Sequence, residues 1–207
     1  MKKLLAVGAV VVILGPLSIF AQPEPSNGKF SLAAAGGAFF PLGTAFKETY
    51  LPGPGGSLTI GYRFSPVIQV FLDLGYQFHK LDHGIFSSYY SVTGGNFGIL
   101  SMVPGVKLYI PGENRLGVYV MAGAGLFRST IGELTVSAPG FEGVTREKES
   151  ETRFGYVLGS GLEYLLTNTV NFLGELRFTD IFPGSKNANN ETNLRHFSFR
   201  LGLRLTF

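Results

Sequence analysis

Two short groups of residues have the types and spacing that could do chemistry. His196 and Ser198 form a His-x-Ser pair, in which the imidazole could take the hydroxyl proton and make the serine a nucleophile. His79, Asp82 and His83 place two imidazoles and a carboxylate within five residues, a spacing that can bind zinc. A structural zinc site usually has four ligands, and no further histidine lies nearby in the sequence. We predict no catalytic residue, no metal site and no cofactor, and interpret both groups as ordinary polar residues.

A larger group consists of charged residues that recur on the polar faces of alternating segments. Its members are Arg63, Asp73, Lys107, Glu163, Glu175, Arg177, Arg200 and Arg204, accompanied by Gln69, Gln77, Tyr119 and His79. If these faces enclose an interior, the charges must pair, because an uncompensated buried charge costs several kcal/mol. We expect a salt-bridged plug built on Glu175 and Arg200. The alternative is that the charges line a narrow, gated pore.

The elements that must position these residues are β-strands, and the last eleven residues show this most clearly. Apolar side chains alternate with small or polar ones from Phe197 to Phe207, and Arg200 and Arg204 lie on the polar face. Because successive side chains of a strand point to opposite faces, a period of two predicts a strand with one apolar face.

Seven further segments alternate in the same way. They cover 29–40, 57–64, 68–79, a segment ending at Ile110, 116–126, 154–164 and 170–179. Long connections over 41–55, 81–95, 129–152 and 180–193 alternate with short turns near 65–66, 111–114 and 167–168. Eight strands is an even number, as a single-chain antiparallel barrel requires. Pro104 predicts a local irregularity in the fourth strand.

Composition limits the classes of function. Charged residues make up 15% of the 207 residues, against roughly 25% in typical soluble domains, which indicates that much of the surface does not face water. The net charge of +3 and the lack of a Lys/Arg cluster argue against a nucleic-acid partner. The absence of cysteine excludes disulfides and thiol chemistry.

The N-terminus resembles a secretory signal peptide. A cationic start, Met1-Lys2-Lys3, precedes an apolar run over 4–20, and Ala21 offers a small residue for cleavage. The alternative, a membrane-anchoring helix, is disfavoured because the run is short and broken by Gly15-Pro16. We predict a signal peptide over 1–21, a short periplasmic segment over 22–28 and a barrel over 29–207.

Alternation alone does not decide which face of the barrel points outward. A soluble barrel of the lipocalin type would turn its apolar face inward. Here the polar face is rich in glycine and poor in charge, the segments are long enough to cross an apolar band about 25 Å tall, and aromatic residues gather near strand ends. These features favour a membrane barrel with its apolar face towards lipid.

The terminal strand resembles the assembly signal of bacterial outer-membrane proteins, carried here by Phe199, Leu201, Leu203, Leu205 and Phe207. The rest of the chain is similar to the small OmpA/OmpX/OmpW-like barrels. The resemblance implies a monomer in the outer membrane of a Gram-negative bacterium, with long loops extracellular and both termini periplasmic. It implies contacts with membrane lipid and lipopolysaccharide, and recognition of the last strand by the barrel-assembly machinery.

Three functions remain open. We expect a non-enzymatic role in envelope integrity or in surface interaction through a ligand at the loops, and a narrow channel for small or apolar solutes is the alternative. Outer-membrane lipid A deacylases resemble this barrel and use a His-x-Ser pair. However, Phe199 stands where that family has Asn, and the alternation turns His196 and Ser198 away from lipid.

The charged run 146–151 and the apolar residues 85–90 lie in the long loops; for 85–90 we favour a strand extension over a sticky tip.

Overall fold

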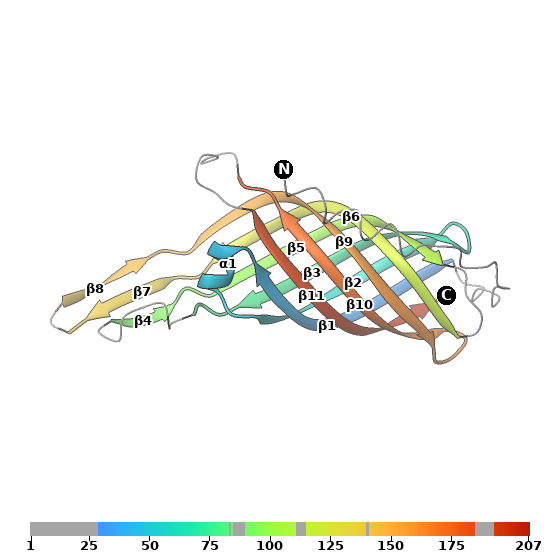
Figure 1. The fold of residues 1–207 in the computed structure, drawn as a ribbon, viewed down its shortest axis with the longest axis horizontal. Coiled ribbons are helices and arrows are strands. Elements are labelled where there is room, and N and C mark those ends of the chain that lie inside the picture. Colours follow the sequence, from blue (N-terminus) through green and yellow to red (C-terminus); the bar gives the residue numbers. More distant parts are fainter. Residues whose placement is uncertain (1–28, 83, 85–89, 111–114, 140, 185–192) are drawn as a thin grey trace, which may run out of the picture.

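The computed structural model describes residues 29–82, 84, 90–110, 115–139, 141–184 and 193–207. Eight antiparallel strands form a closed barrel in the order β1-β11-β10-β9-β6-β5-β3-β2 (Figure 1). They are β1 (Phe30–Leu42), β2 (Gly53–Arg63), β3 (Ile68–His79), β5 (Phe97–Ile110), β6 (Leu116–Ile131), β9 (Glu149–Leu165), β10 (Val170–Ile181) and β11 (Leu194–Thr206). The predicted fold class is confirmed. The predicted signal peptide, 1–21, and the segment 22–28 lie outside the described residues.

The first and last strands close the barrel. Residues from Ser31 to Leu42 pair with residues from Thr206 back to Arg195. Beyond this ladder, the backbone N–H of Phe30 donates to the carbonyl of Phe207 at 3.1 Å, and that of Phe207 donates to the carbonyl of Phe30 at 3.0 Å. Closure matters because hydrocarbon offers no partner for an unpaired strand edge.

Burial follows the predicted alternation. Odd-numbered residues face the lumen in the barrel strands up to β10, and even-numbered residues face it in β11. The other face of each strand points outward and exposes large apolar side chains such as Leu58 and Ile60 on β2. Outward-facing aromatic residues lie close together at both ends: Phe30 and Tyr62 lie 4.9 Å apart between ring centroids at one end, and Phe154 and Phe182 lie 6.3 Å apart at the other. Two aromatic girdles of this kind flank the apolar band of membrane barrels.

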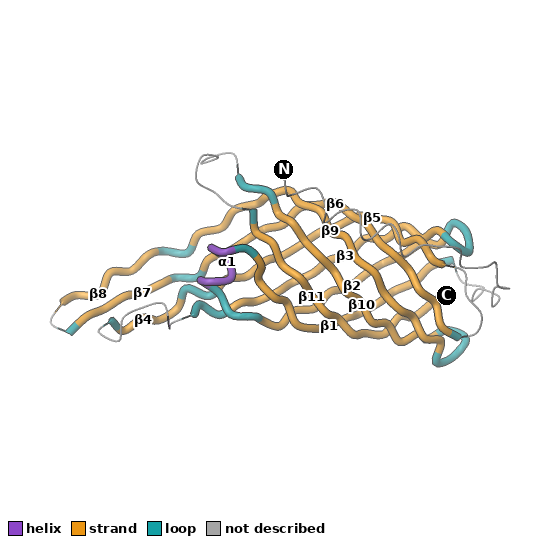
Figure 2. Tube along the Cα trace, in the orientation of Figure 1, coloured by secondary structure: helices purple, strands orange, loops and turns teal. Residues whose placement is uncertain are grey.

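The two ends of the barrel differ. One end, the turn end, holds Phe30, Phe207 and the tight turns at 64–67 and 166–169. The other, the loop end, holds the short helix α1 (Thr44–Thr49), which lies at the rim (Figure 2). Within the described ranges, no helix has the length and apolar character needed to cross a membrane.

Three strands of the barrel continue past the loop end. β4 (Ser91–Gly94), β7 (Leu134–Ala138) and β8 (Phe141–Arg146) form a small sheet that projects beyond the rim, which we call the tongue (Figures 1 and 2). Its register continues that of the barrel below it, because β4 extends β5, β7 extends β6, and β8 extends β9.

Two glycines lie at the junction between β4 and β5. Gly94 and Gly95 have φ values of 82° and 69°, a region that residues with a Cβ rarely adopt. A Cβ on Gly94 would also lie 2.0 Å from the carbonyl oxygen of Glu133. The ladder nevertheless continues, because the N–H of Gly95 donates to that oxygen at 2.8 Å.

The structure corrects three predicted loops and refines one strand. The connection 81–95 contains β4, while residues 83 and 85–89 lie outside the described residues. The connection 129–152 consists largely of strands, because β6 and β9 extend to Ile131 and Glu149 and the tongue lies between them. The connection 41–55 contains α1 and the start of β2. At Pro104 the β5–β6 pairing passes from Met102–Leu126 to Gly105–Gly123 without a register shift. Proline lacks the N–H that the missing ladder bond needs.

Candidate functional site: the barrel lumen

The lumen near the turn end is filled by an ion pair and a tyrosine, which we call the lower layer. Arg204 of β11 contacts the carboxylate of Glu163 on β9, and both side chains are buried. The hydroxyl of Tyr109 lies 2.9 Å from Glu163 Oε1 and 2.8 Å from Gln69 Oε1. The guanidinium of Arg63 covers the Tyr109 ring, with Cζ 4.4 Å from its centroid.

Farther from the turn end, Glu175 of β10 is the centre of a second set of contacts, which we call the middle layer. Lys107 Nζ lies 2.8 Å from Glu175 Oε1, and Arg177 donates to Glu175 Oε2 from Nε at 2.8 Å and from Nη2 at 2.5 Å. The hydroxyl of Tyr119 donates to Glu175 Oε1 at 2.5 Å. Lys107 also lies over the Tyr119 ring, 4.2 Å from its centroid, so the carboxylate is enclosed by donors from three strands.

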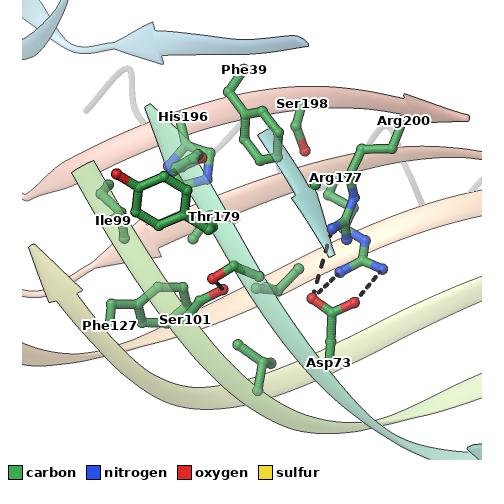
Figure 3. A pocket seen from close by; sticks show the side chains of 16 residues that line it. Phe39, Asp73, Ile99, Ser101, Phe127, Arg177, Thr179, His196, Ser198 and Arg200 are labelled. Carbon is green, nitrogen blue, oxygen red and sulfur yellow. Dashed lines mark hydrogen bonds and ion pairs between the residues drawn. The ribbon is translucent and has the colours of Figure 1, made fainter. Parts of the chain in front are cut away.

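Asp73 of β3 is the second carboxylate of the middle layer. Its oxygens lie 3.1 Å from Arg177 Nη1 and 3.7 Å from Arg200 Nη1 (Figure 3). It also accepts a 2.7 Å hydrogen bond from the Thr59 hydroxyl. Arg200 donates to the Ser57 hydroxyl at 2.7 Å. Charge-assisted bonds of this kind are stronger than neutral ones, and here they link side chains from opposite walls of the barrel.

All eight charged residues singled out from the sequence face the lumen, but their partners differ in part from those expected. Arg200 Nη2 lies 3.5 Å from Glu175 Oε2, farther than Lys107 and Arg177. Glu175 therefore has Lys107 and Arg177 as its nearest cations, and Arg200 contacts both carboxylates of the layer more loosely. The sequence interpretation did not count Tyr109 among the interior residues, although it lies on the same face of β5 as Lys107 and so could have been found.

Inward glycines make room for these side chains. A Cβ on Gly161 would lie 2.4 Å from Cζ and Oη of Tyr119, so the phenol lies directly against the backbone of β9. A Cβ on Gly105 would lie 2.5 Å from Cζ of Phe71. Glycine on one strand thus allows an aromatic side chain from its neighbour to lie flat inside a narrow barrel.

Above the middle layer lies a small cavity of about 30 Å³ with a mixed polar and apolar lining, which we call the chamber (Figure 3). His196 and Ser198 line it, together with Thr179, Ser101 and Gln77. His196 and Ser198 are buried inside the barrel, with exposed fractions of 3% and 1%. This position separates them from the lipid-facing surface.

An apolar cluster closes the loop end of the lumen. Phe46 from α1 is buried and packs with its ring 5.4 Å from that of Phe97 and 5.4 Å from that of His79. Ile99, Phe127 and Ile181 belong to the same buried apolar cluster, and we call these three residues together with Phe46 and Phe97 the stopper. Phe46 was not expected to contribute to the interior, because it lies in a connection that was predicted as a loop.

The zinc-like spacing does not form a cluster among the described residues. His79 points into the lumen and its Nδ1 lies 3.1 Å from the carbonyl oxygen of Leu51. Asp82 Oδ1 instead accepts a hydrogen bond from the N–H of Gly84 at 2.9 Å. His83 lies outside the described residues, and the described part of the chain contains no group of three or more metal-ligating side chains.

The family model described as outer membrane protein beta-barrel domain matches residues 8–207. The chain is similar to the structure of Neisserial surface protein A, with a TM-score of 0.60 and 18% identity over 86% of this chain and 97% of that chain. It is also similar to OprG from Pseudomonas aeruginosa, with a TM-score of 0.55 and 15% identity over 87% and 96% of the two chains. A major outer membrane protein from Thermus thermophilus matches with a TM-score of 0.54 and 15% identity over 86% and 99%. No curated protein matches the chain.

Proposed function

Because the chain belongs to the outer membrane protein beta-barrel family, we propose that it is a closed, non-conducting barrel that supports the outer membrane and presents the tongue for interaction at the cell surface. Both roles are non-enzymatic. They rest on the lumen and on the part of the molecule that projects from the barrel.

The filled lumen carries this proposal. The lower layer, the middle layer and the stopper occupy successive levels, and the chamber between the last two is only about 30 Å³. An eight-stranded barrel has an interior just wide enough for its own side chains. Passage of a solute would require charged pairs to part within a closed space, and leaving one partner without the other is strongly unfavourable.

The tongue supports the surface role. One face of the tongue carries a row of hydroxyls across its three strands, from Thr93, Thr135 and Thr145. The other face carries a row of apolar side chains, from Val92, Val136 and Val144. Val144 is 74% exposed. Apolar side chains on an exposed sheet are typical of interaction surfaces. The proposal places the loop end outside the cell and the turn end in the periplasm.

Planar-bilayer conductance of the refolded chain from Gln22 tests the closed lumen, with Glu175→Gln measured alongside. We expect a folded, silent barrel. Steady discrete openings that change with the substitution would make the lumen a conduit and support the narrow channel instead.

For the orientation, an epitope inserted after Pro139 should be labelled by antibody on intact cells, and labelling only after lysis would contradict the proposed topology.

Enzymatic action on lipid A is disfavoured by the site itself. His196 and Ser198 are enclosed in the lumen between the middle layer and the stopper, where an acyl chain of the membrane has no path to them. Replacing Ser198 with Ala should leave the lipid A of the host membrane unchanged, as measured by mass spectrometry.

A further inference from the structure

The middle layer carries one more positive charge than negative charge. Lys107, Arg177 and Arg200 contribute three cations, whereas Asp73 and Glu175 contribute two carboxylates. All five side chains are buried, with exposed fractions of 4% or less. Buried charges in proteins are normally compensated, because desolvation of an unpaired ion is costly.

Neighbouring carboxylates do not supply the missing charge. Glu163 is neutralised by Arg204 in the lower layer. Asp180 is paired with Arg195, whose Nε lies 3.0 Å from Asp180 Oδ2 at the end of the ladder between β10 and β11. Among the described residues, the surplus positive charge of the middle layer therefore has no protein counter-ion.

The chamber borders this surplus charge, and three of its lining residues have polar atoms that lack partners. Arg200, Gln77 and His196 all line it and are at least 96% buried. Arg200 Nε, Gln77 Oε1 and His196 Nδ1 have no hydrogen-bond partner among the described residues. Such atoms are rare in folded proteins and usually contact a bound water or ion.

The lining can donate hydrogen bonds to an anion. Arg200 Nε always carries a hydrogen, and the Ser198 and Thr179 hydroxyls can rotate towards the chamber (Figure 3). The neutral imidazole of His196 donates from Nδ1 in one of its tautomers, and a rotated Gln77 amide would present its NH₂ group. Asp73 also lines the chamber, but its oxygens are occupied by Thr59, Arg177 and Arg200.

We propose that the chamber is a binding site for one small monovalent anion of the size of chloride. A volume of about 30 Å³ holds two or three particles the size of a water molecule, since about 10–15 Å³ on this measure holds one, so it accommodates one larger monatomic anion. Gluconate is too large for it. The anion supplies the negative charge that the middle layer lacks, and it accepts bonds from donors otherwise left without partners. This inference is independent of the closed-barrel proposal, which concerns conduction.

Thermal unfolding of the full refolded chain in detergent tests the site, with chloride compared with gluconate at equal ionic strength. A ligand that binds only the folded state stabilises it in proportion to the logarithm of its concentration. We expect chloride to raise the unfolding midpoint by about 3–6 °C for each tenfold increase above its Kd. Bromide should act like chloride. Equal midpoints in chloride and gluconate would overturn the proposal.

A matched pair of variants separates the site from a general salt effect. Arg200→Gln removes the surplus charge and a donor, so the midpoint should no longer depend on chloride. Arg63→Gln makes the same chemical change in the lower layer, away from the chamber, and should keep the full dependence. The same chloride dependence in both variants would indicate a non-specific effect and overturn the site.

A second variant and a direct measurement keep the test decisive if Arg200→Gln fails to fold. Lys107→Met also neutralises the surplus without touching the chamber lining, and should weaken the chloride dependence. In crystals grown with bromide, an anomalous peak within the chamber is expected beside Arg200. A chamber without such a peak at high bromide would refute the assignment.

Discussion

Tyr119 donates a 2.5 Å hydrogen bond across the lumen to Oε1 of Glu175, from β6 to β10. These strands are not neighbours in the barrel, because β9 lies between them. The bond therefore spans the interior rather than following the wall. Together with Lys107 and Arg177, it makes Glu175 the residue on which the middle layer depends.

Replacing Glu175 with Gln should lower the thermal stability markedly. The change keeps the shape but leaves three buried cations against Asp73 alone, and breaking a buried ion pair costs about 3–5 kcal/mol. Thermal unfolding followed by circular dichroism and by gel mobility measures the effect. Glu149→Gln is the control, since it removes an exposed ion pair with Arg146 worth at most about 1 kcal/mol. An unchanged midpoint for Glu175→Gln would remove the plug hypothesis.

Gly161→Ala should destabilise the barrel although it adds only one methyl group. The new Cβ would lie 2.4 Å from the Tyr119 phenol, so the ring must move and its bond to Glu175 weakens. Overpacking of this kind costs about 1–3 kcal/mol. Gly36→Ala is the matched control, because its Cβ would lie 3.6 Å from the nearest atom, the carbonyl oxygen of Gly55. Equal stability of the two variants would show that Tyr119 is not held against β9.

Phe46→Ala should weaken the stopper without opening the barrel. Removing a buried phenylalanine costs about 3–5 kcal/mol in a packed core. The middle and lower layers remain below it, so bilayer recordings should stay silent while the unfolding midpoint falls. Val144→Ala, on the exposed surface of the tongue, should change neither quantity. Discrete openings in Phe46→Ala would show that the stopper alone seals the lumen.

Phe207→Ala should slow assembly and leave the folded state almost unchanged. The Phe207 side chain is 70% exposed, and its backbone bonds to Phe30 do not depend on the side chain. The rate of folding into vesicles that contain the barrel-assembly machinery should fall, whereas the rate in vesicles without it should not. Phe172→Ala, an exposed aromatic on β10, serves as control. Identical rates for both variants with the machinery would contradict a role of Phe207 in recognition.

The sequence by itself determined the eight barrel strands, their faces and the charged side chains of the interior. A strand displays its side chains with a period of two, so the inward position of Asp73, Glu175 or Arg204 follows from counting along one segment. The even number of strands followed from the alternation of long and short connections. Strand β3 was predicted with the bounds that the structure has, because only Phe71 interrupts its alternation from Ile68 to His79.

Only the tertiary structure decided which interior residues meet. Lys107 and Glu175 are 68 positions apart, and their contact depends on the tilt and stagger of strands on different walls, which no local pattern encodes. The tongue was missed because its strands have only four, five and six residues and are stabilised by ladders that continue those of β5, β6 and β9. The buried position of Phe46 was also missed. The helix that carries Phe46 has only six residues. Its ring is buried because it packs into the mouth of the barrel, which the sequence of the helix does not reveal.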